Sequence, residues 1–116
     1  MTEMIRYEVE KNVAVLSLND PDRLNALSLD MISQLHEKIK LINEGKTDVR
    51  CLVITGSGRG FCAGANLVEG AGKSSFDDID PGKALEEYYH PFLIDLKNLK
   101  IPLITAVNGV AAGAGC

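Results

Sequence analysis

Two stretches of the sequence consist almost entirely of small residues, and each follows an apolar, strand-like segment. The first is FCAGANL at positions 61–67, and the second is NGVAAGAGC at positions 108–116. Small side chains allow a ligand to lie against the peptide backbone, although tight packing of a strand against a helix would select the same residues. Two peptide N–H groups from separate turns can also bind one oxygen atom, which is the geometry of an oxyanion hole. The presence of two such turns favours this arrangement.

Three glycines at positions 56, 58 and 60 follow an apolar segment, as the glycines of a dinucleotide-binding turn do. Phe61 stands where that pattern requires its third glycine, and no helix is predicted to begin there. A nucleotide-binding α/β domain is therefore kept only as an alternative, which binding of NAD without binding of coenzyme A would favour. Cys62 lies in FCAG, which is not a nucleophile elbow, so we interpret it as a small packing residue.

The composition is that of a small acidic protein. The 116 residues suffice for one domain, with 46% hydrophobic residues and a net charge of -4 from 12 basic and 16 acidic side chains. This charge argues against a general nucleic-acid-binding protein, which needs a basic face. No apolar run approaches the ~18 residues that span a bilayer, and MTEMIRYEVE lacks the apolar core of a signal peptide. The three cysteines and two histidines show neither disulfide nor metal-ligand spacing, so we expect reduced thiols, no metal and a cytoplasmic location.

The first half of the chain predicts a hairpin, a helix and a strand. Alternation predicts a half-buried strand at 5–10, and a turn at 11–12 leads into VAVLSLN at 13–19. That second segment is apolar on both faces and is expected to be covered on both sides. Ser28 is a suitable N-cap for a helix that Gly45 would end. The apolar residues of this helix recur at helical spacing and are expected in the core: Ile32, Leu35, Ile39 and Ile42. RCLVIT at 50–55 predicts a short buried strand.

The second half predicts a loop, a helix and a strand. The polar, glycine-rich segment 69–83 is typical of a mobile surface loop. A helix is predicted over 85–99, with a kink or a fresh first turn at Pro91 because proline has no N–H to donate. PLITAV at 102–107 predicts the last strand. The order is β-β-α-β, a loop, then α-β, which indicates an α/β fold in which two strands can deliver the two small-residue turns to one place.

Three motifs in this order resemble those of the crotonase superfamily, the enoyl-CoA hydratase/isomerase family. They are LNDP at 18–21 with RLNAL at 23–27, LVITG at 52–56 running through FCAGANL at 61–67, and IPLITAVNG at 101–109 with AGAG at 112–115. The likeness covers nearly the whole chain. Within the family, NGVAAGAG and the preceding YHP at 89–91 look most like the phenylacetate-pathway isomerases that act on a ring epoxide carried as a CoA thioester.

The resemblance implies a spiral of ββα units, of which residues 1–116 form the N-terminal part of a single acyl-CoA-binding domain. It implies acyl-CoA substrates, no cofactor other than the coenzyme A of the substrate, and trimers that often pair into hexamers. It also implies an oxyanion hole formed by the N–H groups of Ala65 and Ala114. By the same resemblance, the residues bordering the CoA nucleotide are Arg23, Leu24 and Ala26, and those lining the pantetheine and thioester are Ala63, Asn66 and Leu67, with Gly113 also in the substrate site.

The sequence departs from the family pattern at two informative places. Ala114 stands where hydratases usually carry glycine, and the N–H donor is kept if φ at this residue is negative. The first catalytic carboxylate of hydratases would be the residue after Cys116, so the acids and bases that separate hydration from isomerisation would lie beyond this chain. We therefore expect the 116 residues alone to be inactive. The alternative function is that of a truncated, catalytically incomplete fragment with only a structural or CoA-binding role.

Overall fold

The chain begins with a β-hairpin whose turn is set by two residues in the left-handed conformation. The computed structural model describes residues 3–65 and 85–116. Strands β1 (Ile5–Glu10) and β2 (Val13–Leu18) pair antiparallel from Ile5 with Leu18 to Glu10 with Val13. Lys11 and Asn12 between them have φ of 50° and 67°, as a two-residue hairpin turn requires. The predicted hairpin is confirmed.

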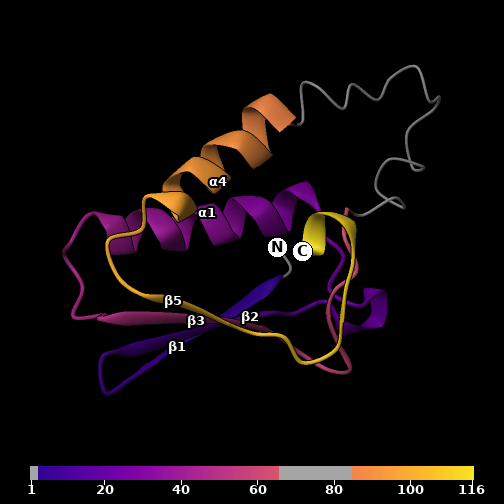
Figure 1. Ribbon diagram of the computed structural model, residues 1–116, viewed down its shortest axis with the longest axis horizontal. Helices are drawn as coiled ribbons and strands as arrows, with labels where there is room; N and C mark the ends of the chain where they lie inside the picture. Colours follow the sequence, from indigo (N-terminus) through magenta and orange to yellow (C-terminus); the bar gives the residue numbers. More distant parts are fainter. Residues whose placement is uncertain (1–2, 66–84) are drawn as a thin grey trace.

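Two further strands extend the hairpin into a four-stranded sheet. Strand β3 (Cys51–Gly56) lies parallel to β2, and β5 (Leu103–Ala106) lies parallel to β3, giving the order β1-β2-β3-β5. The parallel pairs need long connections, and helices supply them. Figure 1 shows both labelled helices lying on the same side of this sheet.

Helix α1 (Leu29–Asn43) begins and ends where the sequence predicts. The Ser28 side chain accepts a hydrogen bond from the N–H of Met31 at 3.0 Å, which satisfies one of the free donors at the helix start. Gly45 follows the helix with φ of 73°, a conformation that glycine adopts without strain. The predicted apolar stripe is buried against the sheet, together with Leu16, Leu52 and Ile54.

The second helix restarts at its proline. A π-helical turn, η3 (Leu85–Tyr89), is followed by α4 (His90–Lys97), and Pro91 stands in the first turn of α4. The fresh turn expected at Pro91 is therefore observed, because the missing N–H is not needed there. Within the described residues, no helix is long and apolar enough to cross a membrane. The loop predicted at 69–83 lies outside the described residues.

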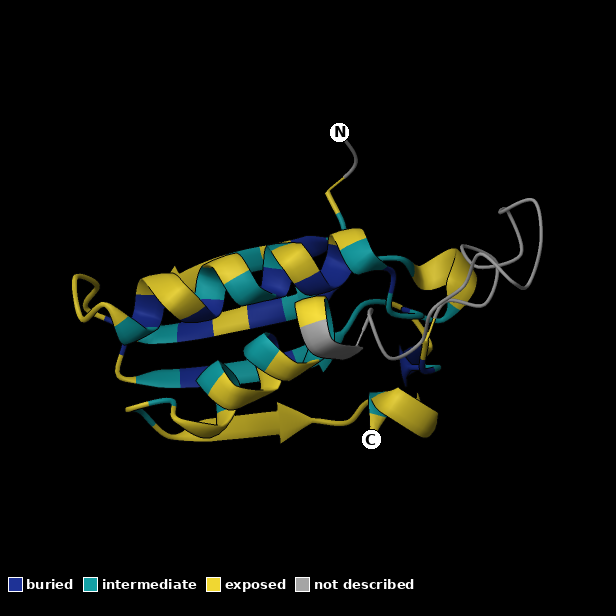
Figure 2. Cartoon of the chain, turned by 90° about the horizontal axis from the view of Figure 1, so that it is seen from above, coloured by how far each residue is buried: buried dark blue, intermediate teal, exposed yellow. Residues whose placement is uncertain are grey.

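The prediction that β2 is covered on both faces is wrong for this chain. Ala14, Leu16 and Leu18 are buried under the helices, but Val15 on the opposite face is 36% exposed. On the same face, Val15 pairs with Val53 of β3, and Val53 pairs with Ile104 of β5, which is 53% exposed. The reason is that the described helices cover only one face of the sheet. Figure 2 shows β5 exposed along its whole length.

A second, two-stranded sheet was not predicted from the sequence. Strand β4 (Gly60–Cys62) pairs parallel with β6 (Val110–Ala111), and each of them leads into one of the small-residue turns. Two short 3-10 turns flank this sheet, η1 (Pro21–Arg23) and η4 (Gly113–Gly115). Strands of three and two residues carry too little alternation to be recognised as strands.

Candidate active site

The two small-residue turns leave β4 and β6 at matching positions. Cys62 pairs with Ala111, and three residues further on stand Ala65 and Ala114 respectively. Each alanine is preceded by a glycine with positive φ, 103° at Gly64 and 52° at Gly113. A side chain at either glycine would be strained, so the sequence has glycine immediately before both predicted N–H donors.

The turns are also in contact with each other. A Cβ atom placed on Gly64 would lie 3.0 Å from the carbonyl oxygen of Ala112 and 3.6 Å from the amide nitrogen of Ala114. Gly64, the residue before Ala65, therefore lies close to the Ala114 amide. The N–H of Ala112 donates to the carbonyl of Cys62 at 3.0 Å, which holds the second turn to the end of β4. The small residues thus serve close backbone packing, and this packing brings the two candidate donors together.

The candidate N–H groups are not used by the fold. Among residues 3–65 and 85–116, neither the Ala65 nor the Ala114 N–H donates to another described residue, and both alanines are exposed. Ala114 is not among the residues with positive φ, so an alanine is compatible with this position. Two neighbouring, unoccupied peptide donors are what binding of a single oxygen atom requires.

The segment before α1 forms the third side of the site. Ala63 donates its N–H to the carbonyl of Leu24 at 3.0 Å, and Leu27 donates to Gly64 at 2.6 Å while pairing with Ala65. Ala26 lies between these contacts, and Arg23 precedes them as an exposed residue that pairs with Asp20 at 3.4 Å. The structure thus joins the three segments that contain seven of the predicted site residues: Arg23, Leu24 and Ala26 in the first, Ala63 and Ala65 in the second, and Gly113 and Ala114 in the third. The other two, Asn66 and Leu67, lie outside the described residues.

Comparison with known proteins identifies the family. Residues 8–116 match the enoyl-CoA hydratase/isomerase family. The chain belongs to this family. It is 45% identical over 115 residues to the 1,2-epoxyphenylacetyl-CoA isomerase of Escherichia coli K12, a match covering 99% of this chain and 44% of that protein. It is 38% identical over 104 residues to the mitochondrial enoyl-CoA hydratase of Pongo abelii, covering 90% of this chain and 33% of that one.

Solved structures of the enoyl-CoA hydratase/isomerase family have the same fold. The crystal structure of an enoyl-CoA hydratase from Mycobacterium smegmatis superposes with a TM-score of 0.86 at 30% identity, covering 99% of this chain and 44% of that one. The fold is thus the N-terminal portion of the crotonase-like spiral of ββα units. The chain spans about two fifths of the length of these relatives.

The glycine-rich turn at 56–60 does not have the form of a dinucleotide site in this family member. The chain passes from Gly60 directly into β4, so the turn does not open a helix whose first N–H groups could bind a phosphate. The polar groups of the turn are occupied by two asparagines that the sequence reasoning did not select. Asn25 donates to the carbonyls of Ser57 and Gly60, and the side-chain oxygen of Asn108 accepts from the N–H of Gly56. Asn25 is the polar residue in the otherwise apolar run 24–27, and this feature of the sequence could have indicated a buried side chain with hydrogen-bond partners.

Cys62 lies under the site and has the features of a packing residue. It is only 2% exposed, and burial raises the pKa of its thiol, with the neighbouring Cys116 adding to the rise and a backbone hydrogen bond from Gly64 partly opposing it. A raised pKa means that less thiolate is present at neutral pH, and the thiolate is the nucleophile. Burial and protonation therefore both disfavour reaction at Cys62.

We expect Cys62 to react with iodoacetamide much more slowly than the exposed Cys116 at neutral pH. Its reaction should also begin at a higher pH, because its folded pKa lies above the ordinary value. Peptide mass spectrometry of samples quenched over time at several pH values measures both rates. In denaturant the two cysteines should react alike. Equal rates in the folded protein at neutral pH would contradict this assignment.

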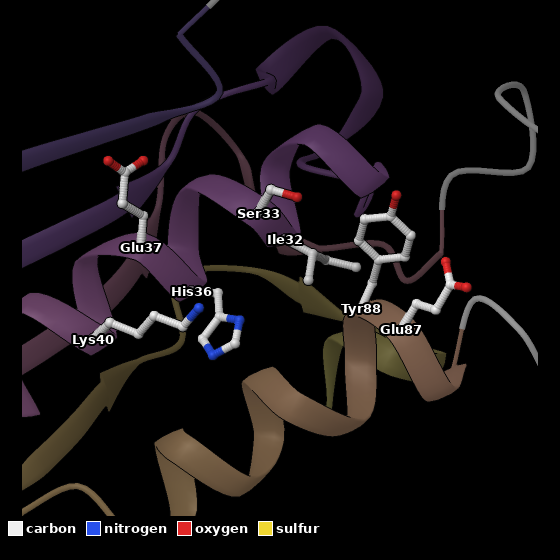
Figure 3. A pocket seen from close by; sticks show the side chains of 7 residues that line it. All are labelled: Ile32, Ser33, His36, Glu37, Lys40, Glu87 and Tyr88. Carbon is white, nitrogen blue, oxygen red and sulfur yellow. The ribbon is translucent and has the colours of Figure 1, made fainter.

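A cavity of about 260 Å³ lies away from the two turns, between α1 and η3. Figure 3 shows His36 of α1 and Tyr88 of η3 turned toward this space. His36 is already engaged, since its Nε2 lies 2.6 Å from an Asp95 carboxylate oxygen and its ring packs edge-on against Phe92. The two candidate N–H donors do not line this cavity. The described site residues predicted from the sequence are likewise not among those lining it, and we regard the cavity as a gap between the helices.

Proposed function

We propose that the complete polypeptide containing these residues is an enoyl-CoA hydratase or isomerase, in which the N–H groups of Ala65 and Ala114 form an oxyanion hole. The observation that carries the proposal is that the two small-residue turns pack against each other at Gly64 and Ala112–Ala114, with the N–H groups of Ala65 and Ala114 both free among the described residues. When electron density moves onto the oxygen of a thioester carbonyl, two fixed donors favour the resulting enolate over the neutral thioester. One such donor typically contributes ~3 kcal/mol to the transition state.

The remaining parts of the proposal concern binding and assembly. Arg23, Leu24 and Ala26 would border the nucleotide of coenzyme A, and the hydrogen bond from the Ala63 N–H to the Leu24 carbonyl, which joins their segment to the 63–65 turn, supports this proposal. Ala63, Asn66, Leu67 and Gly113 would line the thioester and pantetheine. We further propose a cytoplasmic enzyme that uses no cofactor apart from the coenzyme A of its substrate and assembles as a trimer or a pair of trimers.

The relative from Escherichia coli is named for isomerisation of an epoxyphenylacetyl-CoA, and that from Pongo abelii for hydration of an enoyl-CoA. Both names have a CoA thioester in common, so we propose that substrate class and leave the acyl group open. The second candidate function is a catalytically incomplete fragment with a structural or CoA-binding role. The coverage of 44% and 33% of these relatives favours it for the 116 residues taken alone.

The proposal is tested by adding a cinnamoyl-CoA thioester to the complete polypeptide and recording its absorbance spectrum. Two donors on the thioester oxygen should polarise the conjugated carbonyl and move the absorbance band to longer wavelength. Free coenzyme A should compete for binding and reverse the shift. Binding without any shift would contradict the oxyanion hole. An intact mass near 12.5 kDa combined with no turnover would instead favour the fragment.

A further inference from the structure

One backbone carbonyl in the molecule receives hydrogen bonds from two asparagine side chains of distant segments. The oxygen of Gly60 accepts from Nδ2 of Asn25 at 2.9 Å and from Nδ2 of Asn108 at 3.3 Å. Asn25 comes from the segment before α1, and Asn108 lies between β5 and β6. Three separate parts of the chain therefore meet at this oxygen, which lies at the first residue of β4.

Both asparagines use donor and acceptor atoms together. Asn25 is fully buried, its side-chain oxygen accepts from the N–H of Asp20 at 2.8 Å, and its Nδ2 also donates to Ser57 at 3.0 Å. Asn108 is exposed; its oxygen accepts from the N–H of Gly56 at 3.0 Å, and its Nδ2 also donates to Gly58 at 3.1 Å. A carboxylate can only accept, so aspartate could not make either set of contacts.

The clamped carbonyl lies at the start of the strands that carry the proposed donors. Gly60 pairs with Val110 at the beginning of the β4–β6 sheet, and Ala65 and Ala114 stand three residues after the last pair of this sheet, Cys62 with Ala111. The sheet is only three residues by two, so the hydrogen bonds to the Gly60 oxygen are a large part of the contacts at its beginning. A Cβ placed on Gly60 would lie 3.2 Å from the Leu24 side chain, so the segment before α1 packs closely against this residue.

We infer that Asn25 and Asn108 are positioning residues for the oxyanion hole, which they align by fixing the origin of β4 against the start of β6. The inference rests on the proposed function. Neither asparagine touches the substrate oxygen in this arrangement. Each acts through the strand that it holds, so its loss misaligns the N–H groups and leaves acyl-CoA binding largely intact.

The variant to measure is Asn108→Asp, because Asn108 is exposed and the change alters one atom. The carboxylate keeps the acceptor for Gly56 but loses the donors and places negative charge against the Gly58 and Gly60 oxygens. A 1 Å misplacement can cost about 100-fold in rate, and we expect a smaller displacement to lower kcat about 10-fold. KM should stay within about 2-fold, and the shift of the cinnamoyl-CoA band should be reduced.

Asn98→Asp is the matched control. Asn98 is exposed after α4, and its side chain makes no hydrogen bond within the part of the chain that the structure describes. It should leave kcat and the band shift unchanged. Should Asn108→Asp not fold, as judged by circular dichroism, Asn108→Ala removes the amide without adding charge and is expected to behave in the same way.

The outcomes distinguish failure of the positioning role of Asn108 from failure of the proposed function. A band shift and kcat for the Asn108 variant equal to those of Asn98→Asp would overturn the positioning role while leaving the proposed function in place. A rise in KM at constant kcat would also overturn it, since that result indicates a role in binding. Absence of any band shift with the unaltered protein would contradict the proposed function itself.

Discussion

Replacing Ala65 by proline is expected to lower kcat on an acyl-CoA thioester about 100-fold, because proline has no N–H to offer the oxyanion. Removing one donor of such a pair costs ~3 kcal/mol of transition-state stabilisation. The fold should be affected little, since this N–H donates to no other described residue and Ala65 is exposed. Steady-state kinetics together with a thermal melt would measure both effects.

Ala65→Gly is the control for this substitution, because it also changes the side chain at this position but keeps the N–H. It should retain nearly all of the activity. The band shift of bound cinnamoyl-CoA should be small in the proline variant and normal in the glycine variant. Unchanged turnover after Ala65→Pro would refute the assignment of this donor.

The second large effect is expected for Gly115→Ala. A Cβ atom on Gly115 would lie 2.3 Å from the carbonyl oxygen of Cys62 and 2.9 Å from the Cys62 Cβ. Both contacts are too short, so the turn that contains Ala114 must move away from β4. We expect a loss of about 100-fold in kcat from displacement on the order of 1 Å. Overpacking should also lower the free energy of unfolding by about 1–3 kcal/mol.

Gly45→Ala is the control for Gly115→Ala, because it replaces a glycine by alanine at a position far from the proposed site. Gly45 has φ of 73° and no atom within 4 Å of its would-be Cβ, so alanine there costs only backbone strain of about 1 kcal/mol. Denaturant unfolding should show a loss of stability for both variants. Steady-state kinetics should show a lower kcat for Gly115→Ala and an unchanged kcat for Gly45→Ala. A folded Gly115→Ala variant with normal kcat would contradict the prediction.

The elements that the sequence predicts well are those formed by interactions between residues that are close together in the chain. Ser28 caps α1 by a contact three residues away, and the stripe from Ile32 to Ile42 follows from helical spacing alone. Pro91 restarts a helix because it lacks an N–H, whatever surrounds it. These features depend on neighbouring residues, so a single sequence contains the information needed to predict them.

The features of the fold and of the candidate site that the sequence does not predict depend on contacts between distant segments. The sheet of β4 and β6 exists because Gly60 and Val110 are brought together, and neither segment shows a strand pattern of its own. The apolar residues at 13–19 predict burial on both faces of β2, but they do not indicate whether a helix covers one face or both. Asn25 and Asn108 share the Gly60 oxygen as a partner, and no local pattern in the sequence indicates this contact. The small residues could be selected because the prediction depended on their residue type and not on their contact partners.

The parallel pairing of β2, β3 and β5 has a consequence for the order of folding. The hairpin joins neighbours in the chain, but the two turns of the site are about 50 residues apart. Closing a flexible loop of about 50 residues carries a length-dependent entropic cost of about 3.5 kcal/mol, which no local contact offsets beforehand. We therefore expect the two turns to meet only after the central strands have assembled, so the proposed oxyanion hole should be among the last features to form and the first to be lost when the chain begins to unfold.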